Sequence, residues 1–431
     1  MLSLSHKYLS RTKKSKQLYE RAKRVLPAGV SYFIRYIEPH PFYTVRAKGS
    51  KLYDVDGNTY IDFWNGHYYL ILGHAHPRVM RQVKRQLDQG SHYGTAHELE
   101  IALAEQVKRM VPGAEMTRFS SSGTEAMMYA TRLARAATGR NQIGKFEGGW
   151  HGGYDALHVA VRQPFDLPES NGLTPGSAQD TVVLLYNNAE KAREILKHNK
   201  LAAVFIEPAL GSGGCIPAQL DFLKELRELC TENQTLLIFD EVITGFRIAP
   251  GGASEFFGVK PDIRVFGKIL GGGFPIGAIA ASQEITEHMN PLAYPRPKFS
   301  FHGGTFTGNP VTMTAGLETL KILQDGKIIA QLNKKGDKVR KQLKDTFARN
   351  GLDVQVTGVG SLWHTHFTKE KIVDSNVAAR ADKEKLKKYH MHLIENGVFF
   401  LPGKTGALST AHTKNDLDKL ILETEKFKPT P

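Results

Sequence analysis

The chain has 431 residues, more than one hydrophobic core usually serves, and its 41% hydrophobic and 23% charged residues are typical of a globular protein. No apolar run is long enough to cross a bilayer, and two cysteines, Cys215 and Cys230, argue against a disulfide framework or a zinc site. The net charge of +14 would attract polyanions, but the basic residues lie in helical runs interleaved with acids and lack stacking aromatics, which disfavours nucleic-acid binding.

The first fifty residues combine a predicted helix, residues 16–25, with a loop rich in aromatic side chains. Arg35 stands in this loop within the sequence SYFIRYI, where its guanidinium group is suited to binding a carboxylate through two oxygens. Cation–π packing on the surface is the alternative. Residues 51–62, KLYDVDGNTYID, alternate around Asp56-Gly57 and predict a β-hairpin.

An anion-binding turn is predicted where a strand, residues 116–119, meets a helix, residues 126–137. The helices 77–87 and 97–110 precede it. Ser122, Gly123 and Thr124 lie at the helix N-terminus, where unpaired N–H groups and the positive end of the helix dipole favour an anion. A plain helix cap is the alternative. The sequence has neither a Walker lysine nor a GxGxxG motif here, which argues against nucleotides.

Two further predicted strands are followed by candidate functional residues. The predicted strand 142–146 leads into Trp150 and His151 among glycines, and the predicted strand 203–206 ends on Glu207. A buried tryptophan of the core is the alternative for Trp150. Between these strands, residues 163–179 are rich in proline, glycine and polar residues and predict a mobile loop.

The apolar runs 236–239 and 263–266 predict buried parallel strands, and each delivers a charged residue to its carboxyl end: Asp240 and Lys268. Ligands of open α/β sheets bind at this edge, so we expect both side chains in one crevice. An amine and a carboxylate placed together suit a lysine Schiff base on pyridoxal 5′-phosphate (PLP), with the acid holding a proton on the pyridine nitrogen. A helix cap and a solvated loop charge are the separate alternatives for Asp240 and Lys268.

From residue 326 onward, predicted helices and strands alternate as in a second, smaller α/β lobe. We therefore expect three parts: residues 1–50, packing with the small domain; residues 51–325, the large cofactor-binding domain; and residues 326–431, the small C-terminal domain. The large domain should hold a mostly parallel central sheet flanked by helices. The cysteine usage suits a reducing compartment, so we expect a cytoplasmic protein.

The motifs DEVITGFR, FGKILGGG and SSGTEA resemble those of the class III, fold type I PLP-dependent aminotransferases, from about Tyr53 to the C-terminal tail. The resemblance is closest to the glutamate-1-semialdehyde aminomutase branch. It implies a homodimer that binds PLP, with no metal site. It also implies roles for individual residues: cofactor contacts at Ser122, Gly123, Thr124, Trp150, His151, Glu207, Asp240, Val242 and Lys268, a phosphate contact across the dimer from Thr305, and substrate contacts at Arg35 and His67.

The chain departs from the aminomutase pattern at positions that bear on the choice of substrate. Gly403-Lys404 replaces a phenylalanine–glutamate pair, a tryptophan is replaced within residues 67–69, and the loop 163–179 is short. We therefore favour an aminotransferase that exchanges an amino group between a carboxylate-bearing amine, such as a β- or ω-amino acid, and an oxo acid. Glutamate-1-semialdehyde aminomutase is the alternative. A non-catalytic protein of the PLP fold and a nucleic-acid binder are more distant alternatives.

Overall fold

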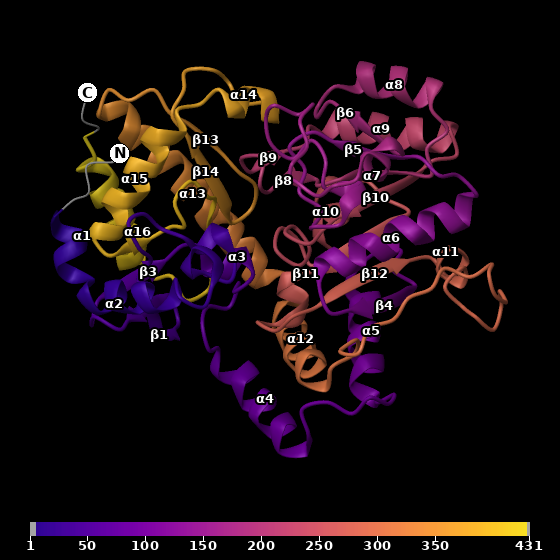
Figure 1. Cartoon of the computed structure of the whole chain (residues 1–431), viewed down its shortest axis with the longest axis horizontal. Helices are drawn as coiled ribbons and strands as arrows, with labels where there is room; N and C mark the ends of the chain where they lie inside the picture. Colours follow the sequence, from indigo (N-terminus) through magenta and orange to yellow (C-terminus); the bar gives the residue numbers. More distant parts are fainter. Residues whose placement is uncertain (1–5, 429–431) are drawn as a thin grey trace.

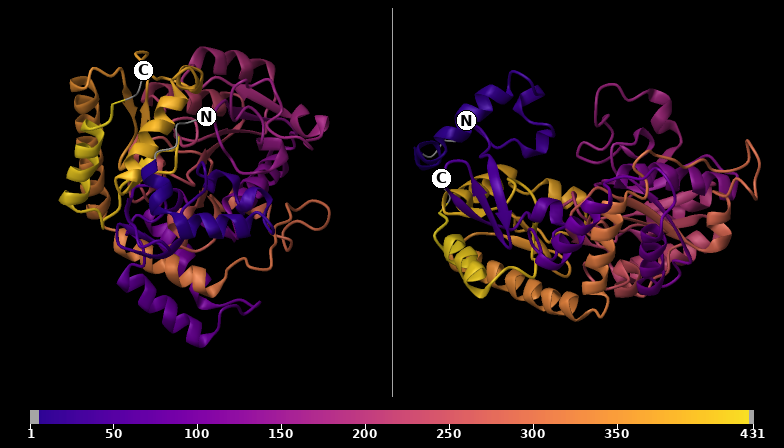
Figure 2. Two further views of the ribbon diagram at one scale, coloured as in Figure 1. Left: turned by 60° about the vertical axis from the view of Figure 1, so that its left-hand side comes forward. Right: turned by 90° about the horizontal axis from the view of Figure 1, so that it is seen from below.

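The computed structural model describes residues 6–428, which form two lobes (Figure 1). One lobe is built on a seven-stranded sheet, and the other combines the N-terminal segment with the C-terminal part of the chain. Both ends of the described chain lie on this second lobe, and the two views of Figure 2 place the N-terminal helices beside the C-terminal ones. Hydrogen bonds join them, from Lys7 Nζ to Asn396 Oδ1 (2.7 Å) and from Arg11 to the carbonyl of Glu395 (3.1 Å).

The seven-stranded sheet has the order β4-β12-β11-β10-β7-β5-β6. Strands β11, β10, β7, β5 and β6 pair in parallel, whereas β12 runs antiparallel to both β11 and β4. The predicted mostly parallel sheet is therefore confirmed. The strand bounds are β4 Met116–Ser120, β5 Ile143–Phe146, β6 Thr181–Leu184, β7 Ala203–Ile206, β10 Leu236–Asp240, β11 Ile263–Gly267 and β12 Gly277–Ala281.

Helices cover both faces of this sheet, as its apolar strands require. On one face α6 packs against β5, β7, β10, β11 and β12, and on the other α8 and α9 pack against the opposite sides of β5, β7 and β10. The helix bounds are α4 Pro77–Gln89, α5 Glu98–Met110, α6 Gly123–Thr138, α7 Pro175–Gln179, α8 Ala189–His198, α9 Leu220–Glu232, α10 Gly252–Phe257, α11 Gln283–Glu287 and α12 Pro310–Leu323. The segment predicted as a mobile loop, 163–179, ends in the short helix α7.

The second lobe contains a four-stranded sheet, β1-β2-β3-β15, and a three-stranded antiparallel sheet, β13-β14-β16. The predicted hairpin is present as β2 and β3, and β15 pairs in parallel with β3. The bounds of its elements are α1 His6–Arg11, α2 Lys13–Ala22, β1 Thr44–Lys48, β2 Lys51–Asp54, β3 Thr59–Asp62, α3 Asn65–Tyr68, α13 Lys327–Arg349, β13 Gln355–Thr357, β14 Leu362–His366, α14 Ser375–Ala379, α15 Lys383–Glu395, β15 Val398–Phe399, β16 Gly406–Ala407 and α16 Lys414–Glu425. A two-stranded ribbon, β8 Ala209–Leu210 with β9 Ile216–Pro217, lies after β7.

The three predicted domains, 1–50, 51–325 and 326–431, remain a proposal. The pairing of β3 with β15 connects residues 51–62 to the sheet of the C-terminal part rather than to the seven-stranded sheet. A large domain that begins after residue 62 agrees better with this hydrogen bonding.

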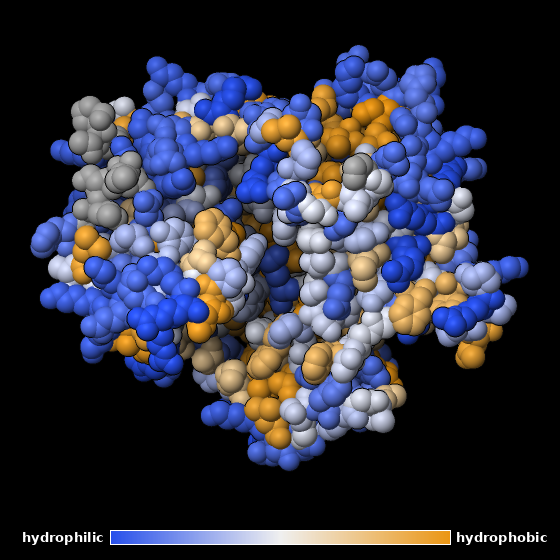
Figure 3. All heavy atoms as spheres, viewed as in Figure 1, coloured by the Kyte–Doolittle hydropathy of each residue, from blue (hydrophilic) through white to orange (hydrophobic). Residues whose placement is uncertain are grey.

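Figure 3 shows hydrophilic side chains over most of the viewed face and a hollow between the two lobes. Among residues 6–428, no helix combines the length and apolarity needed to cross a bilayer. The same residues include no cluster of three or more His, Cys, Asp or Glu side chains placed to hold a metal ion.

Candidate active site

A cavity of about 400 Å³ lies at the carboxyl ends of the parallel strands. Asp240 is the last residue of β10, and Lys268 follows the neighbouring strand β11 directly. Both side chains line the cavity, so the structure brings together the two residues that the sequence placed in one crevice. The cavity is lined by Gly66, His67, Tyr69, Ser121, Ser122, Gly123, Thr124, Met127, Trp150, His151, Gly152, Glu207, Asp240, Val242, Ile243, Lys268, Gly273, Phe274, Pro275 and Ile276.

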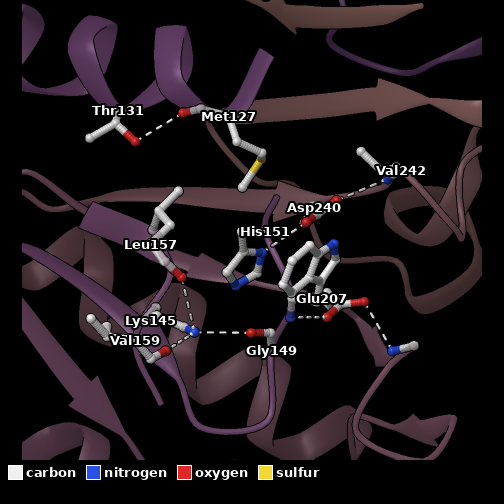
Figure 4. A network of polar contacts seen from close by, with 12 residues as sticks. Met127, Thr131, Lys145, Gly149, His151, Leu157, Val159, Glu207, Asp240 and Val242 are labelled. Atoms are coloured by element: carbon white, nitrogen blue, oxygen red, sulfur yellow. Dashed lines mark hydrogen bonds and ion pairs between the residues drawn. The ribbon is translucent and has the colours of Figure 1, made fainter. Parts of the chain in front are cut away.

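Asp240 is a buried carboxylate with two partners from its own chain (Figure 4). His151 Nδ1 donates a hydrogen bond to Asp240 Oδ2 (2.8 Å), and the backbone N–H of Val242 donates to Oδ1 (3.0 Å). Burial lowers the pKa of His151, although the hydrogen bond to Asp240 opposes this effect. Because both oxygens are fixed, the carboxylate presents its remaining lone pairs in a set direction.

Lys268 lines the cavity near two carboxyl groups and has a strained backbone conformation. Its φ of 48° lies in the left-handed region, which costs a residue other than glycine of order 1 kcal/mol or more. Burial lowers the pKa of Lys268, while the charges of Asp240 and Glu207 oppose the shift. A lysine with a lowered pKa more readily supplies the neutral, nucleophilic amine.

Glu207, at the end of β7, provides a second buried carboxyl group. It accepts hydrogen bonds from the backbone N–H groups of Trp150 (2.8 Å) and Gly211 (2.9 Å). Burial raises the pKa of Glu207, and the nearby charge of Asp240 raises it further. The same contacts tie the segment that carries Trp150 to the end of a neighbouring strand.

The N-terminus of α6 opens into the cavity. Ser122 caps this helix, since its Oγ accepts a hydrogen bond from the N–H of Glu125 (3.2 Å). The first N–H groups of a helix lack intrahelical acceptors, so Gly123 and Thr124 stand where an anion can bind. Close packing fixes the turn: a Cβ added at Gly277 would lie 2.0 Å from the carbonyl oxygen of Ser122.

The segment Asn65–Tyr68 forms a left-handed turn, with φ of 46°, 58°, 69° and 72° at its four residues. Its Asn65 side chain donates to the carbonyl of Ala407 (2.7 Å), which helps to hold this unfavourable conformation. The turn presents His67 to the cavity. Burial lowers the pKa of His67 to about 4, and the charges of Lys268, Arg35 and Lys404 lower it in the same direction.

Two predicted site residues do not line the cavity. Arg35 is exposed in a short 3₁₀ helix, Phe33–Arg35, although its charge acts on His67 and the nearby Tyr32 ring stacks on His67 (5.9 Å between centroids). Thr305 is also exposed, in the segment that precedes α12. The other predicted site residues line the cavity: Ser122, Gly123, Thr124, Trp150, His151, Glu207, Asp240, Val242, Lys268 and His67.

Sequence reasoning assigned no role to several residues that shape this site. Phe274, Pro275 and Ile276 line the cavity after the glycine-rich turn. Arg247, in the DEVITGFR motif, is wholly buried and joins the lobes through bonds to the carbonyl of Tyr68, to Ser361 Oγ (2.8 Å) and to the carbonyl of Leu408 (3.2 Å). The sequence signal that could have identified Arg247 was its position in the DEVITGFR motif.

These residues fit the chemistry of PLP. The cavity combines a buried amine, a fixed carboxylate, an aromatic ring and an anion-binding helix N-terminus. These groups match what the aldehyde, the pyridine nitrogen, the flat ring and the phosphate of PLP each require.

Comparison with known proteins supports this assignment of the cofactor. The family model for class-III aminotransferases matches residues 34–411. A glutamate-1-semialdehyde 2,1-aminomutase from Methanosphaera stadtmanae is 42% identical over 413 residues, which cover 95% of this chain and 96% of the relative. An omega-transaminase structure from Sphaerobacter thermophilus has a TM-score of 0.91 and 36% identity, over 96% of each chain.

Another solved structure, a transaminase with PLP bound, has a TM-score of 0.89 and 32% identity, and covers 96% of this chain and 97% of its own. Of our two leading functional predictions, the aminomutase alternative agrees better with the names of the curated relatives than the favoured aminotransferase does. The family match includes the residues at the strand ends and most of the second lobe. We therefore conclude that this chain belongs to the class-III aminotransferases, a family of PLP-dependent enzymes.

Proposed function

We propose that this chain moves an amino group within one carboxylate-bearing substrate, the reaction of a glutamate-1-semialdehyde 2,1-aminomutase. The observation that carries the chemistry is that Lys268 and Asp240 line one cavity with the N-terminus of α6. The choice of reaction is supported by relatives of that name, 42% identical over nearly the whole chain.

Each proposed role follows from the position of the side chain. PLP, when bound, supplies an electron-withdrawing ring that stabilises negative charge at the substrate carbon beside the amino group. Asp240 would keep a proton on the ring nitrogen, because His151 and the N–H of Val242 hold its carboxylate in place. The amine of Lys268 would attach the cofactor, and after its release would take a proton from one substrate carbon and return it to another.

The remaining residues would bind and orient. Ser122, Gly123 and Thr124 would bind the phosphate, and Trp150 would lie against the ring. Arg35 would hold the substrate carboxylate at the entrance beside His67, which requires movement of its exposed loop toward the cavity.

An intermolecular aminotransferase is the second candidate, and Lys404 favours it. Burial lowers the pKa of Lys404, and within residues 6–428 this side chain forms no ion pair. Lys404 lines a separate cavity, but its charge acts on His67, and a cation near His67 could bind the second carboxylate of a dicarboxylic oxo acid. The 36% identity to an omega-transaminase supports the same candidate.

One experiment separates the two reactions. Protein loaded with either cofactor form is given glutamate 1-semialdehyde alone, or a panel of α-, β- and ω-amino acids with an oxo acid. Movement of the amino group from carbon 2 to carbon 1 without added oxo acid supports the aminomutase; turnover that requires an oxo acid supports the aminotransferase. Protein that stays colourless with PLP, and binds DNA in a salt-sensitive manner, would contradict both.

We also propose a homodimer in which Thr305 reaches the phosphate of the neighbouring site. Thr305 lies between Phe301 and Phe306, which are 57% and 61% exposed, and large exposed apolar side chains often mark an interface. Loss of PLP affinity in Thr305→Ala, together with a dimeric mass in solution, would support this arrangement. We propose the cytoplasm as the location, since both cysteines are free and buried.

A further inference from the structure

Lys145 is a charged residue inside the seven-stranded sheet, in the strand next to the edge strand β6. It lies in β5, and its side chain is wholly buried. Its ammonium group donates hydrogen bonds to three backbone carbonyls, those of Gly149 (2.9 Å), Leu157 (3.3 Å) and Val159 (Figure 4).

Burying this ammonium group is costly. No carboxylate forms an ion pair with Lys145 in the part of the chain that the structure describes, although the charges of Glu207 and Glu169 act on it. Burial lowers the pKa of Lys145 to about 8. An apolar side chain in this strand would avoid the desolvation of a charge, so the position calls for an explanation beyond packing.

The three carbonyls all belong to one segment, residues 149–159, which leaves β5 and passes the cavity. The ammonium group therefore ties the beginning of this segment to its end, across ten residues. Carbonyl oxygens that share one buried cation are held at fixed mutual positions, because each would otherwise be an unsatisfied acceptor.

This segment carries two residues that line the cavity, Trp150 and His151. The N–H of Trp150 bonds to Glu207, and the ring of His151 bonds to Asp240. The path of residues 149–159 therefore decides whether these two groups reach the strand-end carboxylates. Lys145 itself does not line the cavity.

We propose that Lys145 is a positioning residue: its ammonium group fixes the course of residues 149–159 and so sets Trp150 and His151 beside the cofactor. The inference rests on the proposed cofactor site, but not on which amino-transfer reaction takes place there.

The test begins with the cofactor-free protein, so that it does not depend on the proposed function. Hydrogen exchange is measured in Lys145→Met over residues 147–161 and, as a reference, over α8. We expect exchange to rise about tenfold or more in the first segment and to stay unchanged in α8. Leu196→Ala, which removes a buried side chain from α8, is the matched control for a general loss of stability.

The second readout is the affinity for PLP and the absorbance spectrum of the bound cofactor at several pH values. We expect Lys145→Met to weaken PLP binding about tenfold and to change the spectrum, whereas Leu196→Ala leaves both as in the wild type. Lys145→Gln, which keeps two hydrogen-bond donors without the charge, should change PLP affinity and the spectrum less. It replaces Lys145→Met in both measurements if the methionine variant does not fold. The proposal would be overturned if a folded Lys145 variant showed wild-type hydrogen exchange over residues 147–161. It would also be overturned if Leu196→Ala changed this exchange and the PLP affinity as much as Lys145→Met does. Either result would count even if the enzyme turns over substrate.

Discussion

His390 should make the smaller lobe sensitive to acid. It lies buried on α15, its Nδ1 accepts a hydrogen bond from the N–H of Gly403 (3.0 Å), and its ring stacks on Phe400 (5.0 Å, 15°). Burial lowers the pKa of His390 to about 3, so the folded protein holds it neutral. Its stabilising contribution is complete above the unfolded pKa of about 6.5 and is lost as the pH falls from there toward 3.

The magnitude follows from proton linkage. Between about pH 7.5 and pH 5, the unfolded chain gains a proton at His390 that the folded protein does not bind, which lowers the free energy of unfolding by about 2 kcal/mol. In His390→Gln this loss should be absent, while the amide oxygen can still accept from Gly403. The assay is urea unfolding of the cofactor-free protein at both pH values, followed by tryptophan fluorescence, to which Trp363, buried beside Phe400, contributes.

His198→Gln provides the control, since His198 is exposed at the end of α8 in the other lobe. It should leave the pH dependence of unfolding as in the wild type. If His390→Gln loses the same free energy between the two pH values as the wild type does, the argument from a buried neutral histidine is wrong.

Three other substitutions test the site and the backbone around it. Lys268→Ala should abolish the absorbance of lysine-bound PLP and lower turnover by about 10²–10⁴-fold, and turnover at the wild-type rate would refute its role. Ser122→Ala should cost about 1 kcal/mol of stability through the lost helix cap, and a fall in PLP affinity beyond that of a cap variant elsewhere would indicate phosphate contact. Gly272→Ala should be less stable than Gly351→Ala in urea unfolding. Both glycines have a positive φ (58° and 69°), but only at Gly272 would the new Cβ meet a backbone atom, 2.3 Å from the carbonyl oxygen of Ala315. Equal losses of unfolding free energy in the two variants would contradict this.

The parts of the fold that local sequence determines could be predicted. Strands β10 and β11 are continuous apolar runs followed by charged residues, so both their burial and the positions of Asp240 and Lys268 at their ends were readable. Helices with clear starts and polar faces were also placed well: those predicted at 77–87 and 97–110 are Pro77–Gln89 and Glu98–Met110 in the structure. In each case the pattern within the segment and the packing around it favour the same structure.

Features that depend on distant contacts were missed. Strand β12 consists of glycine, alanine and isoleucine, a composition with weak strand preference, and it forms because β4 and β11 pair with it on both sides. In the left-handed turn at Asn65–Tyr68, asparagine, glycine and histidine tolerate a positive φ, but a run of four residues with positive φ is not a local preference. Hydrogen bonds to distant segments hold this turn. Lys145 was overlooked although a lysine inside an apolar strand is itself an unusual signal.

The two buried carboxyl groups of the cavity, those of Asp240 and Glu207, suit different roles because their surroundings differ. Asp240 receives a hydrogen bond from a histidine ring and one from a backbone N–H, whereas Glu207 receives two from backbone N–H groups and lies within the field of Asp240. Burial and this field raise the pKa of Glu207, which favours its protonated form. A carboxyl group whose pKa is raised can donate or release a proton, which is the role that these surroundings favour for Glu207. Asp240→Asn should therefore lower the pKa of Glu207 as well as weaken the hold on the cofactor, and a Glu207 titration unchanged in that variant would show that the two groups act independently.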